Sequence, residues 1–101
     1  MGAKAHNYEV LDPKSGIKYH FAEGSRIQDA QVFAGYGSRV ALHEEVVEGL
    51  VEQYGGEAAR WQHVKGFGVL DVNGEEILTE VHWFQEPSVG KIKFIIKDWF
   101  Y

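Results

Sequence analysis

GVLDVNGEEILTEVHWFQ, residues 68–85, decides the fold, because it holds the strongest short signal for a β-hairpin in the chain. Asn73-Gly74 favours a two-residue type I′ turn, since both central residues of that turn need a positive φ. Such a turn places Leu70 opposite Ile77. Side chains alternate between the two faces of a strand, so the hairpin separates into an apolar and a mixed polar face. The apolar face carries Leu70, Val72, Ile77, Thr79, Val81 and Trp83. The other face carries Val69, Asp71, Leu78, Glu80, His82 and Phe84.

The segment after this hairpin extends it into a three-stranded antiparallel meander. The loop EPSV leads into GKIKFIIKDWF, which again mixes apolar residues and lysines. With a four-residue loop, His82 lies opposite Lys93, and Lys91 and Lys97 join the same polar face. A shift of one residue would bury these lysines beside Trp83, which burial disfavours. The expected strands are residues 66–72, 75–85 and 90–99.

Three further segments precede the meander. VALHEEVVEGLVEQYGG has apolar residues at helical spacing and predicts a helix over about 39–54. Ser38 is its candidate N-cap, and the glycine pair at 55–56 is a natural stop. Closer to the N-terminus, apolar residues alternate on both sides of DPKSG, so residues 8–21 predict a β-hairpin. Residues 22–39 hold three glycines and are expected to form a loop with a helical turn.

These elements predict an α+β fold, with an N-terminal β-hairpin, one main helix and the three-stranded meander packed on that helix. A chain of 101 residues that is 45% hydrophobic is expected to form one domain over residues 1–101. The start, MGAKAHN, resembles a linker remnant, so we expect the domain to be excised from or fused to a larger protein. It has no apolar signal-peptide region, and no apolar run approaches the roughly 20 residues that span a membrane.

Composition bounds the function. The chain has no Cys, which excludes disulfides and thiolate chemistry. Its net charge of −5 argues against a nucleic-acid binder, which usually shows a basic surface. The charge is uneven, however. Residues 41–59 carry five Glu and no Lys or Arg, whereas residues 87–101 carry three Lys against one Asp. Local potential, rather than net charge, decides where a ligand binds.

The polar face of the meander carries the residue types that RNA transesterification needs. One group must take the proton of the ribose 2′-OH, another must protonate the leaving 5′-oxygen, and a cation must stabilise the phosphorane. His82 is the candidate general acid or base, Glu80 would orient it, and Lys93 and Lys97 would bind phosphate. This chemistry needs no cofactor. A Glu-His-Lys row is also common as plain cross-strand pairing, worth roughly 0.2–1 kcal/mol per pair, so both interpretations stay open.

Other chemistries have weaker support. A metal site without Cys would need His and carboxylates, such as His63 with His82 or Glu80 with His82. There is no HExxH motif, so we expect no metal ligands. No Ser lies in a GxSxG context. Among the three Trp, Trp61 is expected to fasten the helix end to the sheet. Trp99 falls on the lysine face, where it could stack on a base or contact a partner.

The order of the motifs resembles a known family. VFAGYG, then YGG followed by W and VKG, then EVHWFQ and GKIKFIIK, are similar to a small domain at the C-terminus of phage minor capsid and head-morphogenesis proteins. The resemblance runs from about Tyr19 to Trp99. Domains at that position resemble nucleases of the barnase, EndoU, colicin RNase and RelE superfamily, in which a helical segment precedes a four-stranded antiparallel sheet. It implies a phage origin, RNA cleavage, and a location in the host cytoplasm or on the virion.

The resemblance also implies roles for particular residues. The catalytic set would be His82, Glu80, Lys93 and Lys97. The residues that would bind RNA are Lys65, Arg26, His20, Lys91 and Trp99. The acidic net charge favours a second hypothesis, a non-catalytic interaction domain of a phage head or minor capsid protein. In that case the acidic helix or the lysine face would dock a capsid or host protein.

Overall fold

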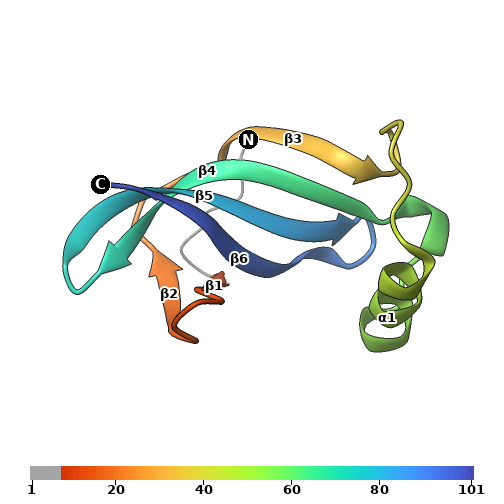
Figure 1. The fold of residues 1–101 in the computed structure, drawn as a ribbon, viewed down its shortest axis with the longest axis horizontal. Coiled ribbons are helices and arrows are strands. Elements are labelled where there is room, and N and C mark those ends of the chain that lie inside the picture. Colours follow the sequence, from red (N-terminus) through yellow and green to blue (C-terminus); the bar gives the residue numbers. More distant parts are fainter. Residues whose placement is uncertain (1–7) are drawn as a thin grey trace.

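Six strands and two short helices make up residues 8–101, which are the residues that the computed structural model describes (Figure 1). The strands are β1 (Glu9–Leu11), β2 (Lys18–Phe21), β3 (Gln28–Gly35), β4 (Gln62–Val72), β5 (Glu75–Glu86) and β6 (Gly90–Phe100). The helices are α1 (Glu44–Tyr54) and the 3₁₀ helix η2 (Ala58–Arg60). The segment MGAKAHN, expected to be a linker remnant, lies outside the described residues.

Five of the strands close into a β-barrel. β4, β5 and β6 are consecutive antiparallel neighbours, and β6 pairs in parallel with β1. β1 pairs with β2, and β2 pairs with the end of β4, which completes the ring. β3 pairs with the first half of the same edge of β4 and stands outside the ring. In Figure 1, α1 lies at the far end of β4–β6 from the β1–β2 hairpin.

The predicted α+β arrangement of hairpin, helix and meander is therefore wrong. The N-terminal strands do pair around DPKSG, but they form part of the barrel wall. Val10 and Phe21 point inward and are 0% and 2% exposed. A sheet that closes on itself covers its own apolar face, so it needs no helix as a second layer. Accordingly, Leu50 is the one residue of α1 that is fully buried.

β3 occupies a segment that was expected to be a loop. Its register with β4 shifts twice, and Asp29 has a positive φ of 53°. These irregularities break the two-residue alternation by which a strand is recognised in a sequence. The helix also begins later than predicted, at Glu44. The Ser38 hydroxyl accepts the N–H of Val40 at 2.9 Å within its own turn, so it does not cap the helix.

The barrel interior is filled by aromatic rings packed against glycine. Trp83 stacks on Phe94 with ring centroids 5.2 Å apart, as its predicted place on the apolar face requires, and Phe21 meets Phe94 edge-on at 5.7 Å. The backbone of Gly68 lies beneath Phe21. A Cβ at Gly68 would stand 2.4 Å from the Phe21 ring, so this position needs glycine.

Two contacts fasten α1 to the open end of the sheet. The indole N–H of Trp61 donates to the carbonyl of Gly55 at 3.2 Å, which confirms its predicted place between the helix end and the sheet. The carboxylate of Glu86, at the end of β5, accepts the N–H of Glu57 at 2.7 Å and the hydroxyl of Ser88 at 2.7 Å. The bonds from Ser88 and Glu57 hold the pKa of Glu86 at about 2, so it stays ionised at neutral pH.

The last strand pairs in a different register from the one predicted. The pairing of Leu70 with Ile77 is confirmed, but His82 lies opposite Ile95 and not Lys93. β6 has one residue more than β5 at two places, near Lys93 and at Lys97. Such bulges bend and twist a strand, and a small barrel needs that curvature to close.

Candidate functional site

The candidate site lies on the outer face of β4 and β5, where two histidines come together. The antiparallel register puts Lys65 of β4 and Ile95 of β6 on either side of His82. His63 of β4 lies opposite Phe84, the next residue on the same face of β5. Alternation along each strand therefore brings His63, Lys65 and His82 to one surface.

His82 and Glu80 form a hydrogen-bonded pair. Nε2 of His82 and Oε2 of Glu80 are 2.8 Å apart, and the two side chains are 12% and 27% exposed. An ionised carboxylate only accepts hydrogen bonds, so Nε2 carries the proton. Nδ1 of His82 is buried and has no hydrogen-bond partner within residues 8–101. The bond to Glu80 thus fixes the orientation of the ring and leaves Nδ1 without a hydrogen-bond partner among residues 8–101.

Aromatic rings pack around the two histidines. Phe33 of β3 lies 4.1 Å from the ring of His63 and 5.1 Å from the ring of His82, centroid to centroid. Phe84 stacks on the other side of His63 at 4.2 Å. The two imidazoles stand edge to face at 5.8 Å. Phe33 belongs to β3, an edge strand whose register with β4 shifts twice.

His63 is held in its neutral form. Burial first, and then the nearby His82 and Lys97, lower the pKa of the His63 ring from 6.5 to about 4. At neutral pH this imidazole therefore carries no charge. Lys97, whose charge contributes to this lowering, lies in a bulge of β6.

His63 should make the folded state sensitive to mild acid. Its pKa is 6.5 in the unfolded chain and about 4 in the folded one, so the unfolded state binds the extra proton first. The stabilisation is complete above pH 6.5 and is lost as the pH falls toward 4. We expect a loss on the order of 1–2 kcal/mol for a ring that solvent partly screens.

Urea unfolding at pH 7 and pH 5 measures this loss. The variant His63→Phe keeps an aromatic ring between Phe33 and Phe84 but cannot titrate, so it should lose less stability between the two pH values. An equal loss in both proteins would show that His63 titrates normally.

The structure separates the other sequence-predicted residues. The charge of Lys97 contributes to the lowered pKa of His63, and Lys65 is the cross-strand neighbour of His82. Lys93, predicted opposite His82, instead lines a cavity with Tyr54 of α1. Lys91 pairs with Gln85 and lines a different, smaller cavity beside Pro87.

The remaining candidates lie elsewhere. Trp99 does not share the lysine face, because the bulge at Lys97 turns it toward the core, edge-on to Tyr19 at 5.5 Å. His20 pairs with Asp71, six positions along β4 from Lys65, which is about 20 Å away at the usual rise of a strand. Arg26 lines a separate cavity beside Phe67.

Sequence reasoning missed the part that His63 and Phe33 play. The sequence offers His63 no evident chemical partner apart from a metal site shared with His82, and it places Phe33 in an expected loop. The signal for His63 was present, because the pairing of the Asn73-Gly74 hairpin, continued far enough back, reaches His63 opposite Phe84. Nothing in the local pattern around Phe33 indicated a strand.

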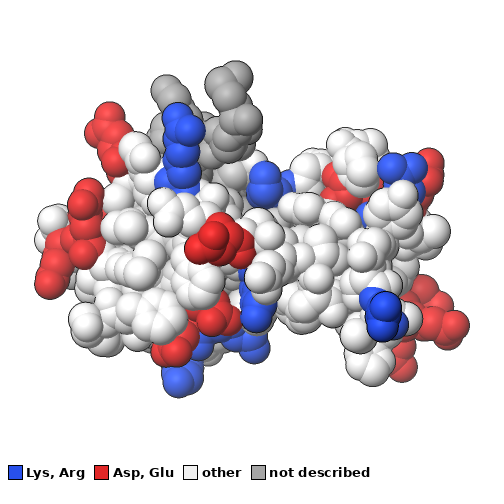
Figure 2. Space-filling model, turned by 90° about the horizontal axis from the view of Figure 1, so that it is seen from above, with Lys and Arg blue, Asp and Glu red and all other residues white. Residues whose placement is uncertain are grey.

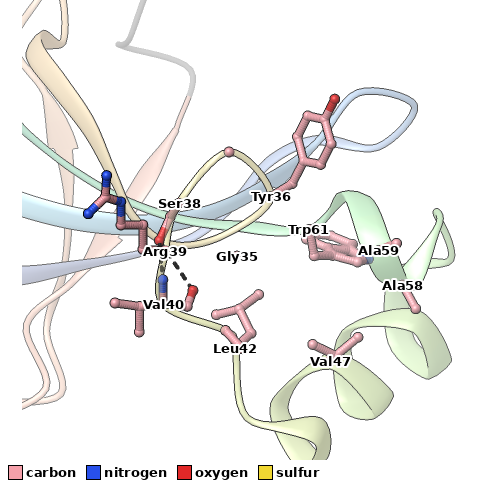
Figure 3. Close-up of a pocket in the computed structure, with 12 residues that line it drawn as sticks. Gly35, Tyr36, Ser38, Arg39, Val40, Leu42, Val47, Ala58, Ala59 and Trp61 are labelled. Atoms are coloured by element: carbon pink, nitrogen blue, oxygen red, sulfur yellow. Dashed lines mark hydrogen bonds between the residues drawn. The ribbon is translucent and has the colours of Figure 1, made fainter.

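Another cavity lies between the β3–α1 loop and α1. Its volume is about 410 Å³, and Leu42, Val47 and Trp61 face one another across it (Figure 3). Arg60 lies over the ring of Tyr36 at its rim, 5.0 Å from the centroid. Acidic and basic side chains are interspersed on the face seen in Figure 2.

Residues 8–101 contain neither a cluster of metal ligands nor a membrane-spanning helix. No three His, Asp or Glu side chains stand together in a way that could share a metal ion. Neither helix has the length and apolar character needed to pass through a bilayer. Comparison of the chain with protein-family models, curated proteins and solved structures found no match in any of the three.

Proposed function

We propose that this domain cleaves RNA by metal-independent proton transfer at His82. One observation carries the proposal. Glu80 engages Nε2 of His82 and leaves Nδ1 buried, oriented and without a partner among residues 8–101. A buried polar atom without a partner is costly, and it calls for an explanation. A substrate hydroxyl is the partner that we assign to it.

The residues divide the reaction among them. Nδ1 of His82 accepts the proton of the 2′-OH, and Glu80 stabilises the imidazolium that forms, as the carboxylate does in a catalytic triad. The leaving 5′-oxygen lies on the opposite side of phosphorus, so a second group, the ammonium of Lys65, protonates it, and solvent then returns the proton from the imidazolium to Lys65. Lys97 and Lys65 supply positive charge for the phosphorane. His63, neutral at pH 7, donates its ring N–H to a phosphoryl oxygen.

Because Nδ1 is buried, a neighbour of His82 must move to admit the substrate, and we assign that movement to Phe33. Its strand, β3, pairs on one edge only, and its register is broken twice. A base that takes the place of Phe33 would stack on His63, and stacking of this kind is worth about 1–3 kcal/mol per base. Stacking of the substrate base on His63 thus compensates for the loss of the contact between Phe33 and His63.

Incubation with single-stranded RNA and with tRNA in the presence of EDTA tests the proposal. We expect the folded protein to cut RNA under these conditions, because no step assigned above uses a metal ion. Circular dichroism of the same samples shows whether the protein is folded. A folded protein that leaves every RNA intact contradicts the proposal.

A second candidate function is the docking of a phage capsid or host protein on α1. The helix carries four Glu and no Lys or Arg, Leu50 is the one residue it fully buries, and Val46 is 37% exposed. A helix with so little buried surface has a face available to a partner. Protection of α1 from hydrogen exchange by a basic capsid or host protein would support this function. Unchanged exchange with each component of the particle would exclude it.

A further inference from the structure

A cavity of about 480 Å³ lies between the β1–β2 hairpin, β6 and the last turn of α1. Lys18 of β2 and Lys93 of β6 both line it, so lysine side chains from two different strands contribute to its wall. Leu11 and Ile95 give it an apolar wall, and Tyr54 gives it an aromatic one. Cationic groups over an apolar and aromatic surface suit a ligand that joins an anion to a flat ring.

Lys93 occupies a position that its backbone does not favour. Its φ is +56°, in the left-handed region where glycine is comfortable and a residue with a Cβ is strained. The strain arises beside the bulge in β6 and directs the lysine to the helix side. There, Nζ lies 6.0 Å from the centroid of the Tyr54 ring. Strained residues of this kind cluster at binding sites, where the fold holds a side chain in a required place.

The cavity adjoins the candidate site. Ile95 lines the cavity and is also the cross-strand partner of His82. Neighbouring strands are about 4.8 Å apart, so the cavity begins roughly one strand away from the histidine. A chain molecule that reacts at His82 can therefore reach into the cavity with its next unit.

We infer that this cavity is a nucleotide subsite, in which Lys18 and Lys93 hold a phosphate and Tyr54 stacks on the base. The assignment of the bound nucleotide to an RNA substrate rests on the proposed function. Glu9 also lines the cavity, and its carboxylate accepts hydrogen bonds only. It therefore suits the hydroxyl groups of a ribose or the amino group of a base, and the two lysines outweigh its charge.

Binding to uncleavable probes tests the subsite without any reaction. The probes are adenosine 5′-monophosphate, adenosine, inorganic phosphate and a single-stranded DNA oligonucleotide, each titrated by calorimetry. We expect the monophosphate and the oligonucleotide to bind more tightly than adenosine or phosphate, because only they present both the anion and the ring. Equal binding of inorganic phosphate would reduce the site to an anion site and overturn the inference.

The variant Lys93→Gly tests the contribution of the lysine side chain to binding without destabilising the fold. Glycine relieves the positive φ, so the thermal midpoint should stay equal or rise, while affinity for the oligonucleotide falls about tenfold. The slope of log affinity against log salt should shrink by about 0.7, the value for one phosphate contact on a single strand. Lys14→Ala, an exposed lysine in the β1–β2 turn, is the matched control and should change affinity less than twofold.

The outcomes separate the two proposals. If Lys93→Gly binds the oligonucleotide as tightly as the parent, or loses no more affinity than Lys14→Ala, the subsite is wrong whatever RNA cleavage shows. If the oligonucleotide binds through Lys93 but RNA is never cut, the subsite stands and the proposed reaction fails.

Discussion

Replacement of His82 by glutamine should lower the rate of RNA cleavage by about 10²- to 10⁴-fold, the usual contribution of a positioned acid or base. The glutamine amide can still donate a hydrogen bond to Glu80, which now accepts one from His82 at 2.8 Å. It has no nitrogen that can take up a proton. Because the contact with Glu80 survives, we expect the domain to remain folded, and the rate of cleavage in EDTA measures the loss.

The control for this variant is His43→Gln. His43 is exposed at the N-cap position of α1 and makes no side-chain capping bond there, so its replacement should leave cleavage unchanged. Equal cleavage by the parent and by folded His82→Gln would remove His82 from the reaction. The pair Glu80–His82 would then be cross-strand surface pairing.

Phe21→Ala should cost about 3–5 kcal/mol of the free energy of unfolding, the usual cost of removing a buried aromatic ring. Phe21 is 2% exposed, packs edge-on against Phe94 and fills the space above Gly68. A domain of this size has roughly 5–15 kcal/mol of stability in total, so the variant should be marginal. Urea unfolding measures the change.

This variant tests the closure of the barrel, because Phe21 belongs to the N-terminal hairpin. Ile17→Ala in the same hairpin is the control, since Ile17 is 50% exposed and its removal should change stability by no more than about 0.5 kcal/mol. If the hairpin lay apart from the core, both variants would lower the free energy of unfolding by a similarly small amount. That result would contradict the closed barrel.

The parts of the fold that could be predicted from the sequence depend on residues that are close together in the chain. Asn73-Gly74 carries the turn and therefore the register of β4 with β5, because the two strands follow it directly. The closure is non-local. It depends on the parallel pairing of Val10 with Phe94 and on the pairing of Phe21 with Leu70, which are distant in the chain. No local pattern contains those pairings.

The candidate site divides in the same way. Glu80 and His82 share a face because they are two residues apart on one strand, and that could be predicted. The place of Lys93 could not, because Glu86 pairs with Gly90, which makes the loop one residue shorter than expected, and the bulge near Lys93 adds a second shift. Phe33 reaches the histidines from a strand with broken alternation, so its contact is visible only in the folded chain.

The most direct measurement is the chemistry of the cut ends. A DNA oligonucleotide that contains a single ribonucleotide is incubated with the protein in EDTA, and the masses of the products are measured by mass spectrometry. Attack by the 2′-OH must cut after that ribose and leave a 2′,3′-cyclic phosphate beside a free 5′-OH. That product is the result we predict. Cutting at deoxyribose positions, or ends that carry a 5′-phosphate, would contradict proton transfer from the 2′-OH to His82.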